Sequence, residues 1–104
     1  MTTGEHIVIV TFETSPETQT EALHKIGAYV DGFLSRQPGF LGSQLHRSLD
    51  GTALVHYARW RSEADFQAAG EKARAHPDMP ALRLYKPAGR DYSVWATYPQ
   101  DTAT

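Results

Sequence analysis

The sequence contains no cysteine, and this absence removes several chemistries at once. A disulfide framework, a thiol nucleophile, a thiolate-bound zinc ion and an iron–sulfur cluster all require cysteine sulfur. A charge excess is also absent, because 10 Lys and Arg residues face 12 Asp and Glu residues, for a formal net charge of −2. Proteins that bind a phosphate backbone carry a basic excess. The composition therefore argues against nucleic acid as a partner.

Long hydrophobic runs are absent as well. The apolar stretch at residues 6–12 is far shorter than the roughly 20 residues of a membrane-spanning helix. No basic segment precedes it, as one would in a signal peptide. We therefore expect a cytoplasmic protein that does not contact a membrane.

Motifs for bound cofactors are also missing. The chain has no phosphate-binding loop, no dinucleotide fingerprint and no G-x-S-x-G sequence. Its five histidines are scattered and lack the paired spacing of metal ligands. The sequence therefore predicts neither a metal site nor a cofactor.

What the chain does contain is enough apolar material for one folded domain. It has 104 residues, of which 40% are hydrophobic and 21% charged. These values are typical of a single globular domain. We expect one domain over residues 1–104, with its core at about 6–98.

Hydrophobic periodicity and turn residues predict the order strand, helix, strand, strand, helix, strand. The expected strands are 6–12, 40–48, 53–61 and 90–98. The first helix should start at a Ser15 cap with Pro16 in its first turn, and the second at a capping box over 62–65. Asp50-Gly51 marks a hairpin turn. A short helical turn is expected at 81–85, and a frayed tail at 99–104.

This order is that of the ferredoxin-like α+β fold, βαββαβ, in which both helices cover one face of a four-stranded antiparallel sheet. In the third strand, alternation places Leu54, His56, Ala58 and Trp60 on one face and residues such as Val55 and Tyr57 on the other. Both faces are thus apolar, and two helices can cover only one of them. The alternation therefore predicts a homodimer that covers the second face.

Two segments carry a resemblance to a known family: QPGFLGSQLHRSLDG at 37–51, and VHYARWRSEADFQ at 55–67. With the capped first helix, they resemble the antibiotic biosynthesis monooxygenase family over about residues 6–98. The resemblance implies a dimeric α+β barrel. It also implies a cofactor-independent monooxygenase that oxidises a polycyclic aromatic of the anthrone or quinol type with molecular oxygen.

The resemblance places one site residue directly and shows two differences. Trp60 matches the family tryptophan, but His56 stands four residues before it where family members typically carry Asn. Phe66 stands six residues after it, where some members have Tyr. The physical logic of such a reaction is that the deprotonated substrate supplies the electrons, so the protein must bind a flat ring, hold a base and exclude water.

His56 and Trp60 are the candidate catalytic residues, because residues four apart on a strand share a face. Small residues on the second helix should leave a pocket beside them, with His56 as base and Trp60 as a flat wall. The structural alternative is a buried histidine bonded to a neighbouring tyrosine, beside a tryptophan that only fills the core.

Five further residues are candidates for substrate binding: Phe33, Phe66, His76, Arg83 and Tyr85. His76 lies in a loop that could close over a pocket, or it could simply complement a helix C-terminus. Arg83 and Tyr85 could reach the pocket, or be a surface arginine and a half-buried tyrosine.

Two alternatives to the monooxygenase hypothesis remain. The haem-degrading branch of the same fold also pairs a strand tryptophan with a downstream histidine, here His76. A non-catalytic binding or cyclase-like barrel protein is the alternative from a different class.

Overall fold

The computed structural model describes residues 4–100. In this part of the chain, four strands and three helices follow the predicted order, and η1 is a single 3-10 turn. The elements are β1 (His6–Glu13), α1 (Gln19–Gly32), η1 (Leu34–Arg36), β2 (Phe40–Arg47), β3 (Ala53–Trp60), α2 (Glu63–Arg74), α3 (Met79–Arg83) and β4 (Ala88–Ser93).

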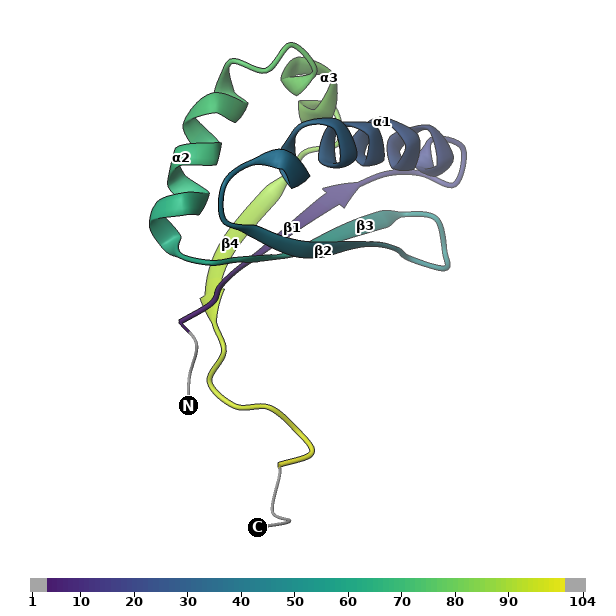
Figure 1. Ribbon diagram of the computed structural model, residues 1–104. Helices are drawn as coiled ribbons and strands as arrows, with labels where there is room; N and C mark the ends of the chain where they lie inside the picture. The colour runs from purple at the N-terminus through teal and green to yellow at the C-terminus, as the bar shows by residue number, and fades with distance from the viewer. Residues whose placement is uncertain (1–3, 101–104) are drawn as a thin grey trace.

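The sheet confirms the ferredoxin-like prediction. Its strand order is β2-β3-β1-β4, and every neighbouring pair is antiparallel. Figure 1 shows the helices gathered over one face of the sheet, with the opposite face bare. This arrangement fixes where a site can form, because only the helix-covered face is enclosed by the chain itself.

The β2–β3 hairpin follows the predicted Asp-Gly turn. The Asp50 carboxylate accepts hydrogen bonds from the Thr52 hydroxyl (2.7 Å), the Thr52 N–H (3.0 Å) and the Ser48 hydroxyl (2.8 Å). These bonds lower the pKa of Asp50. Gly51 has a positive φ of 82°, a conformation that glycine adopts without strain.

The start of α2 is also as predicted. Ser62 caps the helix by accepting a hydrogen bond from the Asp65 N–H at 3.1 Å, and Arg61 forms an ion pair with Asp65 at 2.7 Å. Gly39 (φ 86°) lies against this cap, where a Cβ would overlap the Asp65 side chain. The cap therefore fixes the N-terminal end of α2 to the start of β2.

The start of α1 differs from the prediction. The helix begins at Gln19, after the N-cap residue Thr18, and Ser15 does not cap it through its side chain. Instead the Thr18 hydroxyl accepts a hydrogen bond from the Ser15 N–H at 2.9 Å, which closes a separate turn over residues 15–18. A local side-chain bond of this kind competes with the first turn of a helix.

The last strand was predicted too long. β4 ends at Ser93, because Ser93 pairs with His6, the first residue of β1, and within residues 4–100 no strand lies beside the chain beyond that point. Trp95, predicted to lie in the strand, is 91% exposed. The short helix is confirmed as α3, shifted to residues 79–83. Of the predicted frayed tail, residues 101–104 lie outside the described part of the chain.

The two faces of the sheet differ as the alternation predicts. In β3 the residues facing the helices are all buried, and the residues between them are only half-buried. Two clusters of buried residues lie under the helices. One surrounds Leu54 and Ile26, and the other surrounds Trp60 and Ala58. A cavity lies on this covered face.

Candidate active site

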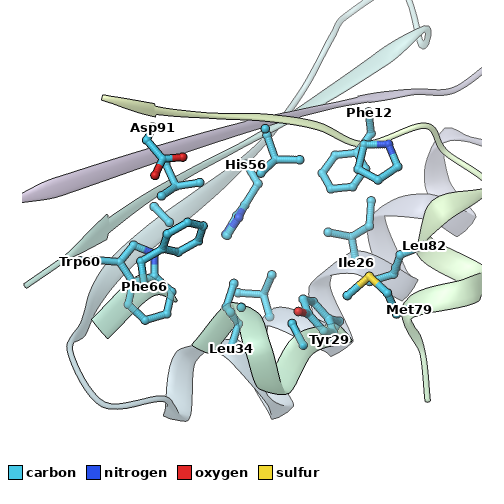
Figure 2. A pocket seen from close by; sticks show the side chains of 18 residues that line it. Phe12, Ile26, Tyr29, Leu34, His56, Trp60, Phe66, Met79, Leu82 and Asp91 are labelled. Carbon is cyan, nitrogen blue, oxygen red and sulfur yellow. The ribbon is translucent and has the colours of Figure 1, made fainter. Parts of the chain in front are cut away.

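The cavity has a volume of about 320 Å³ and lies between the sheet and the helices. Figure 2 shows its lining, which comes from β1, β3 and β4 on one side and from the helices on the other. Most lining side chains are aliphatic or aromatic. Such a cavity suits a mostly apolar ligand oriented by a few polar groups.

His56 projects from the centre of β3 into this cavity (Figure 2). Its side chain is buried, with 5% of the residue exposed, and Nε2 has no hydrogen-bond partner among the described residues. The alternative in which a neighbouring tyrosine satisfies this nitrogen is therefore not what the structure shows. Burial lowers the pKa of His56 from 6.5 to about 4, so the imidazole is neutral at pH 7.

Trp60 forms one end of the cavity and is completely buried. Its ring packs edge-on against Phe40, at 5.2 Å between centroids, and against Phe66, at 5.6 Å. The indole Nε1–H has no partner among the described residues. Trp60 is thus both a core residue and a cavity wall, and it leaves one hydrogen-bond donor unused.

Small residues on α2 create the space, as the sequence indicated. Gly70 and Ala73 line the cavity, and Ala69 is the only α2 residue that is fully buried. A Cβ at Gly70 would have no neighbouring atom within 4 Å. The inward face of α2 therefore does not fill the volume above β3.

The remaining polar groups on the lining were missed from the sequence. Tyr29 on α1 lies across the cavity from His56 (Figure 2), and burial raises the pKa of its hydroxyl. Asp91 on β4 accepts a hydrogen bond from the His6 Nε2 at 2.8 Å. Tyr29 follows Ile26 by three residues, so helical spacing could have predicted that both lie on the same apolar face of α1. Asp91 depends on the β1–β4 pairing, which local sequence does not show.

The structure brings together three of the predicted site residues: His56, Trp60 and Phe66. Phe33 and His76 do not line the cavity. They lie behind Tyr29, with the His76 ring 5.1 Å from the Tyr29 ring and 4.7 Å from the Phe33 ring. The haem-degrading alternative pairs Trp60 with His76, but His76 does not face the cavity that Trp60 lines.

Two other predicted residues also lie outside the lining. Tyr85 is buried in the cluster that includes Leu82, and its carbonyl accepts a hydrogen bond from the Glu13 N–H at 2.7 Å. Arg83 is exposed at the end of α3.

Within residues 4–100, no three His, Cys, Asp or Glu residues are grouped so that they could hold a metal ion. No helix in this part of the chain is long and apolar enough to cross a membrane.

The sequence of residues 6–76 matches the family model described as antibiotic biosynthesis monooxygenase. The chain belongs to this family. The match begins at the first residue of β1 and ends at His76, so it contains His56, Trp60 and Phe66 but not Asp91.

Relatives within the monooxygenase family share both sequence and fold with the chain. The tetracenomycin-F1 monooxygenase of Streptomyces glaucescens is 36% identical over 72 residues, which are 69% of this chain and 64% of that protein. The match thus spans less than two thirds of the relative's length.

Two solved structures show the same fold. One is a monooxygenase from the gene ActVA-Orf6 of Streptomyces coelicolor, in complex with nanaomycin D. It is 28% identical with a TM-score of 0.76, and the alignment covers 88% of each chain. The other is SnoaB of Streptomyces nogalater, a cofactor-independent oxygenase. It is 24% identical with a TM-score of 0.71, over 93% of this chain and 99% of SnoaB, and this likeness shows the fold alone.

Proposed function

We propose that this chain is a cofactor-independent monooxygenase that oxidises a flat polycyclic aromatic, of the anthrone or quinol type, with molecular oxygen. The observation that carries the proposal is the buried His56 imidazole, with its unpartnered Nε2, facing an apolar cavity beside the unpartnered Trp60 Nε1–H. Family membership and the activities of the related monooxygenases support the same reaction class.

In this proposal His56 is the base. A neutral imidazole accepts a proton from the methylene carbon of an anthrone, and the electron pair of the broken C–H bond spreads over the rings and the ketone. Negative charge forming beside the imidazole raises its pKa again, which favours the transfer. The low pKa of the empty site keeps the ring unprotonated and ready to accept a proton.

The substrate carbanion supplies the electrons for oxygen. It passes one electron to O2, and the two radicals combine to form a C–O bond. The resulting peroxide anion takes back the proton from the His56 imidazolium, and the hydroperoxide loses water to leave a carbonyl. One oxygen atom enters the quinone and the other leaves as water. The apolar lining protects the carbanion from protonation by solvent.

Trp60 has two roles in this proposal. Its ring closes one end of the cavity that takes the flat substrate, and its unused Nε1–H is a donor for the substrate oxygen that gains negative charge. Phe66 holds the Trp60 ring from the side and completes the same wall.

Phe33, His76 and Tyr85 have supporting roles in this proposal, because they pack behind lining residues rather than on the cavity. Phe33 and His76 contact the Tyr29 ring, and Tyr85 lies in the cluster of Leu82. The cytoplasmic location expected from the N-terminal sequence stays a prediction.

The test is anthrone oxidation followed by quinone absorbance under air. We expect His56→Ala to lower kcat at least tenfold, since a positioned general base contributes roughly 10²-fold or more. The exposed residue His24 supplies the matched control, His24→Ala, which should keep wild-type activity. Equal rates for the wild type and His56→Ala would contradict the base assignment. Ligand binding without any turnover would instead indicate the non-catalytic alternative.

We also propose that the chain forms a homodimer through the face of the sheet that the helices leave bare. Val55, Tyr57 and Ile9 on this face are only half-buried, and Tyr92 is 44% exposed. A face with this much apolar surface suits a protein interface.

Light scattering coupled to gel filtration tests the dimer directly. We expect twice the 11.6 kDa mass of one chain for the wild type, and one chain mass for Tyr57→Lys. Glu71→Lys, on the exposed surface of α2, is the control that should stay dimeric. A wild type that elutes with the mass of a single chain would contradict the proposal.

A further inference from the structure

Asp91 is the only carboxylate on the cavity wall within the described residues. The rest of the lining is almost entirely apolar. The Asp91 side chain is 48% exposed, so the carboxylate lies where the cavity wall meets solvent and stays hydrated on one side. Figure 2 places Asp91 at the same end of the cavity as Trp60 and Phe66, away from Phe12 and Leu82.

The strand register fixes how far Asp91 lies from His56. Val8 on β1 pairs with both Ala58 and Asp91, and Val10 pairs with both His56 and Gly89. Asp91 is therefore two strands across and two residues along from His56. Strand spacing and rise make this a backbone separation of about 12 Å.

The sheet surface between these two polar residues is apolar. Gly89 has no side chain and Ala58 has only a methyl group, and both line the cavity with Val8 and Val10. A flat fused-ring ligand can lie over them with one edge at His56 and the other at Asp91.

His6 holds the Asp91 side chain in place. The His6 Nε2 donates to Asp91 Oδ2 at 2.8 Å, and this bond assigns the ring proton to Nε2. The His6 side chain is 13% exposed, and its ring lies 5.6 Å from the ring of Phe66, a wall residue. Among residues 4–100, the hydrogen bond of Asp91 is made by Oδ2, and the half-exposed carboxylate leaves Oδ1 open to accept a bond from water or a ligand.

We propose that Asp91 is a specificity-determining residue, which accepts a hydrogen bond from a phenolic hydroxyl on the substrate, and that His6 is the positioning residue that orients it. His56 Nε2 and Trp60 Nε1 have no partner among the described residues, so a ligand in this cavity has two further polar atoms that it can match. The ligand class is then a neutral fused-ring aromatic with a hydroxyl on the ring distant from the reacting carbon. The proposal rests on the proposed function in taking this cavity as the substrate site.

The test compares two probes that differ only in the hydrogen-bond donor, 2-naphthol and 2-methoxynaphthalene, bound under nitrogen. A hydrogen bond to a carboxylate is roughly twice as strong as a neutral one, so we expect the wild type to prefer 2-naphthol about tenfold. Asp91→Ala should remove this preference, and Asp91→Asn should reduce it at least threefold. Glu71→Gln is the charge-matched control and should keep the wild-type ratio.

His6→Phe tests the positioning role, because it keeps an aromatic ring beside Phe66 and removes the donor to Asp91. We expect the probe preference to fall at least threefold, while the affinity for 2-methoxynaphthalene stays within twofold of the wild type. A purely structural role for His6 would weaken both probes equally and would overturn this part of the proposal.

Failure of this proposal can be separated from failure of the proposed function. A tenfold preference retained by Asp91→Ala, or no preference in the wild type, overturns the role of Asp91 whatever the activity. A wild type that keeps the preference but never oxidises an anthrone under air overturns the monooxygenase activity and leaves the hydroxyl site in place.

Discussion

The two ends of the helix-covered face use the same strands for different purposes. Around Leu54, the end near the β2–β3 hairpin is filled by Phe12, Ala22 and Ile26, all buried. Around Ala58, four residues further along β3, the cluster of buried residues is smaller, and Ala58 itself lines the cavity, which Leu54 does not. The difference shows a partial separation along β3: Leu54 packs without lining the cavity, whereas Phe12 and Ile26 belong to the packed cluster and also line the cavity.

The helices explain this separation. α1 buries four residues, including Ile26 and Tyr29, whereas α2 buries only Ala69. Burial of large aliphatic and aromatic side chains supplies most of the driving force for folding. The packed end should therefore control stability, and the α2 end should control ligand size.

The largest expected effect comes from breaking the packed end. Leu54→Ala removes a fully buried side chain and should lower the free energy of unfolding by about 3 to 4 kcal/mol. Urea unfolding followed by circular dichroism measures this value. The affinity of the folded variant for 2-naphthol should change less than threefold, because Leu54 does not line the cavity. A larger loss of affinity would contradict the separation of the two ends.

His56 at the cavity end gives a pH-dependent effect of slightly smaller size. Below pH 6.5 the unfolded chain binds a proton at His56, whereas the folded chain binds it only near pH 4. The contribution of His56 to stability is therefore complete above pH 6.5 and decreases as the pH falls toward 4. Between pH 7.5 and 4.5, the wild type should lose about 2.5 kcal/mol more than His56→Leu.

Urea unfolding of both proteins at the two pH values gives this difference, and the other histidines cancel in the comparison. Equal pH dependence in the wild type and His56→Leu would mean that the folded state does protonate this imidazole. The same variant should be more stable at pH 7.5, because it removes a buried nitrogen without a partner.

The smallest expected effect comes from Gly70 on α2, where a substitution should change ligand affinity without lowering the free energy of unfolding. Gly70→Leu places a side chain into free space and should weaken 2-naphthol binding about tenfold, which is about 1.4 kcal/mol. Gly70→Ala is the matched control: it should stabilise the protein by up to about 1 kcal/mol through helix propensity and change binding less than threefold. Titration calorimetry and urea unfolding check the two quantities. A destabilised Gly70→Leu would contradict the view that α2 contributes little to packing.

Two features that depend on neighbouring residues were predictable from the sequence, whereas a third, the Ser15 cap of α1, was predicted wrongly. The Asp50-Gly51 turn and the Ser62 cap form through bonds within a few residues, and both are confirmed. The end of β4 was not predictable in this way. The alternation from Tyr92 onward continues past Ser93, but the partner strand starts at His6, and that limit is set by pairing across the sheet.

The candidate site follows the same rule. Strand alternation placed His56 and Trp60 on one face, and Phe66 followed from the spacing of α2. Asp91 was missed because its place beside the cavity depends on the register between β1 and β4. His76 was expected at the cavity because it lies in a loop after the second helix that could close over a pocket, whereas its ring packs against Tyr29.

The small residues on the inward face of α2 have a consequence for how the family can diversify. Positions such as Gly70 and Ala73 define the shape of the cavity but belong to a helix that contributes only one fully buried side chain. Mutations there can change which ring systems fit while the protein stays above the stability threshold that limits most sequence drift. One scaffold can then give rise to descendants with different substrates, each reached by a few substitutions on a single helix.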